Sequence, residues 1–360
     1  MLSLRSVLLL LFILLGLVPS SWACAICAPT DAGGTLRQRL RAADVAVLAA
    51  PAAGGGFTAQ QLLKGDWPKG PIRPPLVEPA LSRGPALLLY RSGAAEWQIA
   101  GPLSFDRADW LRQLLALADA PDLAPARWAA RIGPFVRELE HPEPLVAQVA
   151  YEEIAGAPYA VMRAAAARLD AALLPRWLDT PALTARRPLY ALLLGFNGNQ
   201  SSALVLQARM AALRDATDGP TLSAMLAAWL ELRGPDGVAW VERQYLSGPA
   251  ASEIGVAAAL LALSVHGADG QRLGRERIVQ AYRHDLARTA HRGVEVDIGQ
   301  CQRVLGVSGD ATDLALDLRP ACDQVDHVAR EAGGCAAQGH DALAVQNHAQ
   351  FGGAALAKGG

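Results

Sequence analysis

The sequence lacks cysteine over a long central stretch, because its five cysteines lie near the two ends of the chain. Cys24 and Cys27 stand near the N-terminus, and Cys301, Cys322 and Cys335 stand near the C-terminus. Disulfide bonds therefore cannot hold the middle of the protein together, and packing has to do so. An odd number of cysteines also means that one thiol stays free or pairs between chains.

The sequence has little excess charge of either sign. Its 33 basic and 34 acidic side chains give a net charge of −1, and lysine occurs only at Lys64, Lys69 and Lys358, so almost every cation is an arginine. A nucleic-acid-binding protein is expected to carry a basic excess or a basic stripe, which this sequence lacks. The composition therefore predicts that nucleic acid is not a partner.

Common catalytic motifs are absent as well. The sequence contains no GxxxxGK[ST], HExxH or GxSxG pattern, and no GxGxxG pattern between a strand and a helix. The adjacent carboxylates Glu152 and Glu153 are expected on a solvated helix face rather than in an acid–base pair. We therefore predict that the protein is not an enzyme, with a hydrolase that lacks a recognisable motif as one alternative.

One hydrophobic run is present, and it lies at the N-terminus. Arg5 precedes the uncharged apolar residues 7–18, and small residues stand at positions −3 and −1 before Cys24. A helix of this length spans about 18 Å, which is less than the hydrocarbon core of a bilayer at about 30 Å. Residues 1–23 therefore predict a signal peptide that is cleaved between Ala23 and Cys24, and a periplasmic or secreted protein without a stable membrane span. Membrane association would require an uncleaved signal or a lipid on Cys24.

Cleavage there would leave Cys24-Ala-Ile-Cys27 at the new N-terminus. The expected state is a local disulfide, which forms by default in an oxidising compartment. The same spacing suits thiol exchange, and two thiolates suit Cu(I) or Zn(II), while lipidation or a free thiol completes the alternatives. No strand-helix scaffold of the thioredoxin type surrounds the pair.

The last segment, 291–360, is poor in aromatic residues and is expected to be a flexible tail. It carries two C-x4-H pairs, Cys322 with His327 and Cys335 with His340. Four such ligands can in principle bind zinc, but a chance match in this tail is the expected explanation. We therefore predict no resident cofactor, with copper or zinc as the alternative.

Short apolar runs bounded by glycine and proline predict strands in residues 44–105, which follow an N-terminal CxxC segment at 24–43. The expected strands are Val45–Leu48, Phe57–Leu63, Leu76–Val77, Ala86–Tyr90 and Trp97–Ile99. Their spacing is typical of a small β barrel or sandwich. Trp67, in a turn, either contacts a partner or folds back onto the sheet.

This β region resembles a known family in three features. They are the cysteine at the mature N-terminus, the stretch Ala43–Leu48, and a strand that starts at Phe57 and ends at Lys64-Gly65-Asp66. Together they resemble the netrin-like module of tissue inhibitors of metalloproteases, which implies an OB-type barrel. The partner cysteines of that module are absent here, so the resemblance implies the barrel and not the inhibitory activity.

Helical periodicity dominates residues 107–290. The clearest helices are expected from Trp110, around a Gly133-Pro134 break, from Pro144 to Gly156, from Leu222 to Gly234-Pro235, and after a cap at Ser252. Further helices are expected near 160–174, 185–194, 203–216, 237–246 and 275–286. His266 should cap a helix end, and Asn199-Gln200-Ser201 should form a turn or, alternatively, a glycosylation acceptor.

Successive helices joined by short connections over residues 126–286 resemble the HEAT-like α-solenoids. An irregular array or compact helical bundle is the alternative. The sequence thus predicts a mostly α protein with a small N-terminal β module. Because solenoids bind through extended surfaces, we expect an exported protein-interaction or scaffold protein with a protein partner. The alternative is a thiol-redox or copper- or zinc-handling accessory protein that uses Cys24 and Cys27.

Overall fold

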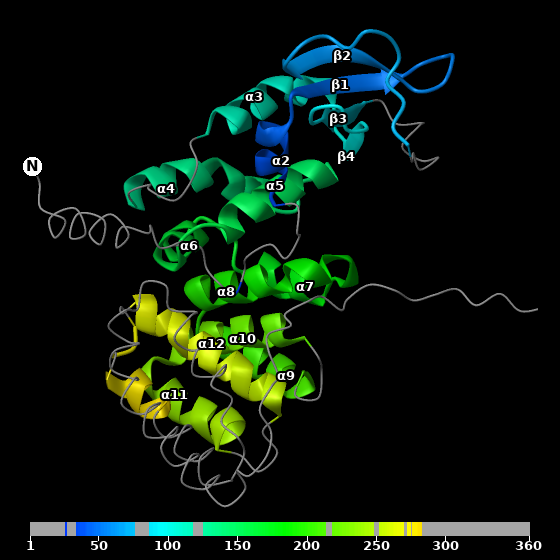
Figure 1. The fold of residues 1–360 in the computed structure, drawn as a ribbon. Coiled ribbons are helices and arrows are strands. Elements are labelled where there is room, and N and C mark those ends of the chain that lie inside the picture. The colour runs from blue at the N-terminus through cyan, green and yellow to red at the C-terminus, as the bar shows by residue number, and fades with distance from the viewer. Residues whose placement is uncertain are drawn as a thin grey trace, which may run out of the picture.

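The computed structural model describes residues 26, 34–75, 86–117, 125–213, 218–247, 252–269, 272–274 and 276–282. The chain is mostly helical, with a four-stranded antiparallel sheet at one end of the molecule and the helices α9 to α12 at the other (Figure 1). The predicted signal peptide, the strand expected at Leu76–Val77 and the predicted tail lie outside the described residues.

The sheet contains β1 (Val45–Pro51), β2 (Phe57–Lys64), β3 (Leu87–Arg91) and β4 (Gln98–Pro102), in the spatial order β2-β1-β3-β4. Four of the five predicted strands are therefore confirmed. Within the described residues β4 pairs with β3 alone, and β2 pairs with β1 and otherwise only through an isolated bridge between Phe57 and Ile72, so the strands form one open sheet. The expected barrel or sandwich is not formed by these residues, because closing a barrel requires paired edges and more strands.

The two central strands of the sheet, β1 and β3, are buried on both faces. Alternate residues of β1, such as Ala46 and Leu48, face the main core, which continues into the helices. Val45, Val47 and Ala49 point to the opposite face, where they form a second cluster with Phe57, Ile72, Leu87 and Leu89. Burial on both faces explains why β1 is an unbroken apolar run instead of an alternating one.

A short helix that the sequence analysis did not predict precedes the sheet. Helix α2 (Leu36–Ala42) begins with a capping box, in which the Thr35 side chain accepts from the Gln38 backbone and the Gln38 side chain accepts from the Thr35 backbone. Its residues Leu36 and Leu40 are fully buried in the main core. The helix therefore fixes the N-terminal segment onto the rest of the protein.

The helical part begins with η2 (Phe105–Arg107) and α3 (Ala108–Ala116). The remaining elements are α4 (Pro125–Ile132), η3 (Gly133–Glu138), α5 (Pro144–Ala155), α6 (Tyr159–Ala166), α7 (Leu173–Asp179), η4 (Pro181–Arg186), α8 (Arg187–Asn197), α9 (Gln200–Ala212), α10 (Gly219–Arg233), α11 (Pro235–Val241), the π-helical η5 (Glu242–Leu246) and α12 (Glu253–Asp269). A last helical stretch covers residues 276–282.

Most predicted helix boundaries are confirmed where local chemistry sets them. Pro144 occupies the first turn of α5, α10 ends at Gly234, and the Ser252 hydroxyl accepts from the Gly255 backbone N–H at 3.0 Å. The single helix expected over 160–174 is wrong. Here α6 ends at Ala166 and α7 begins only at Leu173, with turns in between.

Helix α10 is the centre of the helical part. It packs against α8, α9, α11 and α12, and every residue from Thr221 to Glu231 is buried. This burial is that of a helix surrounded by other helices, which is buried all round instead of along one apolar stripe. The close packing depends on Gly195 of α8, where an added Cβ atom would lie 2.5 Å from the Cα atom of Ala228 in α10.

Replacement of Gly195 by alanine should destabilise the fold. An alanine normally stabilises a helix interior by about 1 kcal/mol relative to glycine, but here the new methyl group meets a backbone atom. We expect a net loss of about 1–3 kcal/mol, measured as the free energy of unfolding in urea. Gly54→Ala is the matched control, since nothing lies within 4 Å of a Cβ atom there. Equal or higher stability of the Gly195→Ala variant would contradict the close helix contact.

Candidate functional site

The residues that the sequence analysis selected as sites lie outside the described residues. These are Ala23, Cys24 and Cys27 at the N-terminus, and Cys322, His327, Cys335 and His340 near the C-terminus. Ile26, which stands between the first two cysteines, is described and is buried in the main core with 5% of its surface exposed. The structure brings a different set of residues together, around the ends of three helices.

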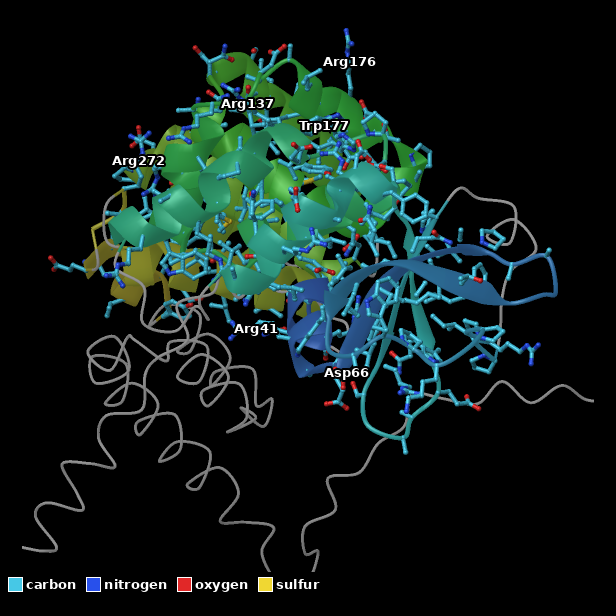
Figure 2. All side chains as sticks on the ribbon, turned by 90° about the horizontal axis from the view of Figure 1, so that it is seen from above. Arg41, Asp66, Arg137, Arg176, Trp177 and Arg272 are labelled. Atoms are coloured by element: carbon cyan, nitrogen blue, oxygen red, sulfur yellow. The ribbon has the colours of Figure 1, made fainter. Side chains whose placement is uncertain are left out.

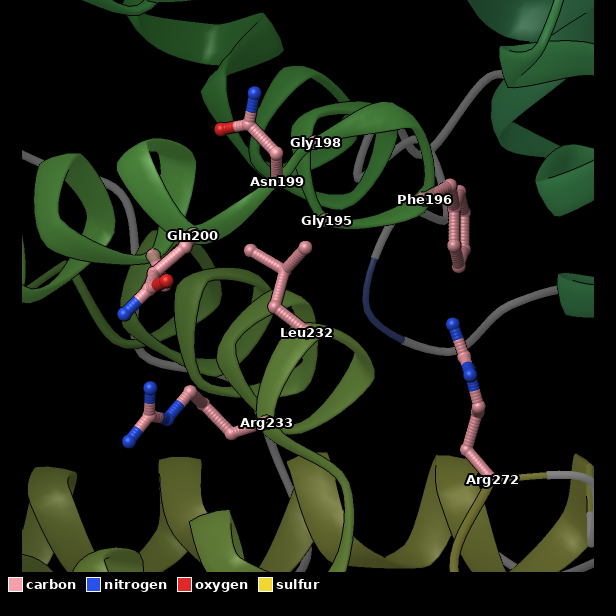
Figure 3. A pocket seen from close by; sticks show the side chains of 9 residues that line it. Gly195, Phe196, Gly198, Asn199, Gln200, Leu232, Arg233 and Arg272 are labelled. Atoms are coloured by element: carbon pink, nitrogen blue, oxygen red, sulfur yellow. The ribbon is translucent and has the colours of Figure 1, made fainter.

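A cleft of ≈ 380 Å³ opens where α8 and α10 end (Figure 3). Its lining combines two arginines, two amide side chains, an aromatic ring and small or aliphatic residues. The lining residues are Gly195, Phe196, Gly198, Asn199, Gln200, Ala203, Leu232, Arg233 and Arg272. They come from the α8–α9 junction, from the last turn of α10 and from the segment that follows α12.

The α8–α9 junction is held by Asn199, which is the N-cap of α9. Its Oδ1 accepts hydrogen bonds from the backbone N–H groups of Ser201 at 3.0 Å and Ser202 at 3.3 Å. Instead of the predicted turn, Asn199 leads directly into α9, whose first residues are Gln200 and Ser201. The cap fixes the start of α9, so that Gln200 and Ala203 line one side of the cleft.

A buried carboxylate lies behind the cleft. The side chain of Glu231, in the last turn of α10, is 1% exposed. Arg163 of α6 donates from Nε to Oε1 at 2.7 Å and from Nη2 to Oε2 at 2.9 Å, which is the bidentate geometry of a strong ion pair. Arg272 donates from Nε to Oε1 at 3.1 Å. Glu231 thus connects α6, α10 and the segment after α12.

His266 belongs to the same buried group. His266 lies in the last turn of α12, near the helix end as predicted, but it does not cap this helix, because its ring is fully buried and bonds to α10. Its Nε2 donates to the backbone carbonyl of Ala227 at 2.9 Å, and its ring packs edge-to-face on Tyr159. Its Nδ1 lies 3.9 Å from Glu231 Oε2. His266 therefore joins α12 to α10 inside the core.

The pKa of Glu231 reflects this environment. Burial by itself raises the pKa of a carboxyl group, but hydrogen bonds and charge from Arg163, together with the hydrogen bond from Arg272, outweigh it. The net pKa of Glu231 lies below its ordinary value of 4.5. The carboxylate is therefore ionised at neutral pH and holds both arginines in place.

The lining of the cleft carries groups that can bind a ligand. Its nine lining residues include no serine, cysteine, histidine, lysine or carboxylate, which are the usual nucleophiles and acid–base groups. They offer guanidinium and amide donors above a partly apolar floor. Such a lining suits a polar or anionic ligand.

The described part of the chain contains no group of three or more histidine, cysteine, aspartate or glutamate side chains arranged to hold a metal ion. In that same part, none of the helices combines the length and the hydrophobicity that crossing a membrane requires.

A second buried group corrects the expectation for Glu152 and Glu153. Both residues are 3% exposed, so they do not lie on a solvated helix face. Arg37 of α2 donates from Nε to Glu153 Oε1 at 2.9 Å, and Arg131 of α4 donates from Nε to Glu153 Oε2 at 2.9 Å. Glu153 thus joins α5 to two other helices. The side chains of Arg37 and Arg131 are 5% and 6% exposed.

Glu152 connects α5 to the start of α2, next to the ion pairs of Glu153. Its Oε2 accepts from the backbone N–H of Leu36, at the start of α2, at 2.7 Å. Its Oε1 accepts from Gln148 Nε2 at 3.0 Å. Burial raises the pKa of Glu152 above its ordinary value of 4.5, against the opposing effect of these hydrogen bonds.

Two features of the sequence point to the contact between α2 and α5. Thr35 and Gln38 have the S/T-x-x-Q spacing of a capping box, which marks the start of a helix. Glu152 and Glu153 lie in a helix that is apolar from Leu145 to Ala155 apart from Gln148 and the Tyr151 hydroxyl, which leaves little polar surface around them. Their arginine partners lie far away in the sequence, so no local pattern identifies them.

No family model, no curated protein and no solved structure matches this chain. A function for this chain therefore has to be argued from its own residues.

Replacement of Glu153 by glutamine should strongly destabilise the protein. The variant leaves Arg37 and Arg131 buried without the carboxylate that faces them, which typically costs about 3–5 kcal/mol. Urea unfolding measures the loss. Asp109→Asn is the matched control, because the Arg112–Asp109 ion pair is largely exposed and is expected to contribute about 0–1 kcal/mol. An equal loss of unfolding free energy for the two substitutions would show that the buried ion pairs of Glu153 are not important for stability.

Glu231 and Glu152 should respond to pH with opposite signs. The pKa of Glu231 is lowered on folding, so its contribution to stability is present above about pH 4.5 and is lost as the pH falls through the folded pKa. The pKa of Glu152 is raised, so its contribution is present below about pH 4.5 and is lost as the pH rises through the folded pKa.

The measurement is urea unfolding of the native protein, Glu231→Gln and Glu152→Gln between about pH 3 and about pH 7. The stability advantage of the native protein over Glu231→Gln should grow as the pH rises. The stability advantage of the native protein over Glu152→Gln should decrease over the same rise in pH. A common trend for the two variants would contradict the assigned directions.

Proposed function

We propose that this chain is an exported protein-interaction protein, in which a small β sheet and a HEAT-like helical array present a surface to a protein partner. The observation that carries the proposal is the open cleft at the ends of α8 and α10, whose lining is suited to binding. Export rests on the N-terminal sequence, where a charged residue, a short apolar run and small residues precede Cys24.

The packing of alternate helices supports a HEAT-like array. Helix α6 packs on α8, α8 packs on α10, and α10 packs on α12. Helix α6 also contacts α12, so the series is compact as well as successive. The intervening helices α7, α9 and α11 pack against members of this series. Arrays of this kind expose the ends and connections of successive helices along one edge, where partners bind.

Exposed apolar side chains add to this surface. Leu204 is 64% exposed and lies one turn after Gln200 on α9, so it shares a helix face with a residue of the cleft. Trp67 is 55% exposed in the turn after β2. An exposed tryptophan is a frequent anchor in protein interfaces.

Site-specific photo-cross-linking in the native host tests the proposal. A photoreactive residue placed at Leu204 or Trp67 should capture a discrete partner, identified by mass spectrometry. The same residue at Arg176 is the control, because this side chain projects from α7 away from the rest of the molecule (Figure 2). Capture only at Arg176, or at none of the three positions, would contradict the proposal.

A further inference from the structure

We infer that the cleft binds an acidic peptide segment of the partner, in which two carboxylates flank an apolar side chain. This inference rests on the proposed protein-interaction function and specifies the chemistry of the partner. It depends on how Arg233 and Arg272 are held on opposite sides of Leu232 (Figure 3).

Arg272 is oriented by a buried partner and is still available for binding. Its Nε donates to Glu231 Oε1 at 3.1 Å, whereas no protein acceptor among the described residues bonds its two Nη atoms. The side chain is 57% exposed and lines the cleft. A guanidinium group fixed along one edge can offer its remaining donors to a carboxylate with little further loss of entropy.

Arg233 is held on the opposite side of Leu232 by an aromatic ring. Its guanidinium carbon lies 5.3 Å from the centroid of the Trp229 ring, which is within the range of a cation–π contact. The structure gives it no hydrogen bond or ion pair with any described residue. Its charge is therefore oriented and has no carboxylate partner among the described residues.

The local charge balance favours an anion. Three guanidinium groups, those of Arg163, Arg233 and Arg272, lie at or behind the cleft, and Glu231 is the carboxylate that binds two of them. Glu231 accepts hydrogen bonds from Arg163 and Arg272, and the described residues give Arg233 no carboxylate partner. The excess is local, because the whole chain carries a net charge of −1.

The floor between the two arginines favours an apolar side chain. In Figure 3 the Leu232 side chain projects into the cleft between Arg233 and Arg272. Ala203, Gly195 and the ring of Phe196 complete the apolar lining, and Gln200 adds an amide that can bond a peptide backbone. A ligand with a carboxylate, an apolar side chain and a second carboxylate would match the order Arg233, Leu232 and Arg272 across the cleft.

A peptide fits better than a small free diacid because the apolar surface continues beyond the cleft. Leu204, largely exposed, extends it along α9 from Gln200. A cleft of ≈ 380 Å³ accommodates only a few side chains, so the rest of a bound segment would lie along this helix. The partner is thus an acidic segment presented by another protein.

Fluorescence anisotropy with the full mature chain tests the inference. The probe is a labelled peptide that carries aspartate and glutamate on both sides of one leucine, and its amide counterpart carries asparagine and glutamine instead. We expect binding of the acidic probe that weakens with added salt, and a loss of about tenfold or more for the amide probe. Arg233→Ala and Arg272→Ala should each weaken binding about fivefold, whereas Arg176→Ala should leave it unchanged.

Arg233→Ala keeps the test valid if Arg272→Ala disturbs the fold, because Arg233 makes no contact with Glu231. Equal binding of the acidic and amide probes, or no effect of Arg233→Ala, would overturn the inference. Displacement of the probe by glutarate with equal affinity would also overturn it in favour of a small diacid. If a partner is captured at Leu204 while the acidic probe fails to bind, the interaction function stands and the acidic-peptide inference falls.

Discussion

Two buried glutamates, each held between two arginines, join helices that are far apart in the sequence. Glu153 of α5 binds arginines of α2 and α4, and Glu231 of α10 binds an arginine of α6 and one that follows α12. These pairs connect the N-terminal segment and the last described helices to the central helices. They are important in a chain whose middle has no cysteine and therefore no disulfide.

The choice of arginine follows from the cost of burying charge. A carboxylate loses its hydration on burial, and several charge-assisted hydrogen bonds are needed to compensate for this loss. Arginine supplies them in a fixed planar arrangement, as Arg163 does with its two bonds to Glu231, whereas lysine presents a single compact charge. Such pairs contribute more to a defined arrangement of helices than to net stability, because the desolvation cost offsets much of the attraction.

Local features of the fold could be predicted from the sequence, and long-range features could not. Asn199 and Ser252 mark helix starts through hydrogen bonds to their own neighbours, and Pro144 does so through its fixed φ angle, so their roles were predictable. Glu153 could not be placed, because Arg37 lies 116 residues away and only the fold brings the two together. The cleft was missed for the same reason, since its lining comes from three separate segments.

The arginines around Glu153 and those around Glu231 differ in how completely they are buried. This difference indicates which of the two clusters can bind a ligand. Both arginines bound to Glu153 are buried, with side chains 5% and 6% exposed, so that group is closed and holds the fold. The group around Glu231 is closed on one side only, because Arg163 is 19% exposed and Arg272 is 57% exposed. A buried carboxylate that holds an exposed arginine in a fixed orientation at the edge of a cleft prepares that arginine for a ligand. The same interaction that joins the helices thus creates a position at which an external anion can bind.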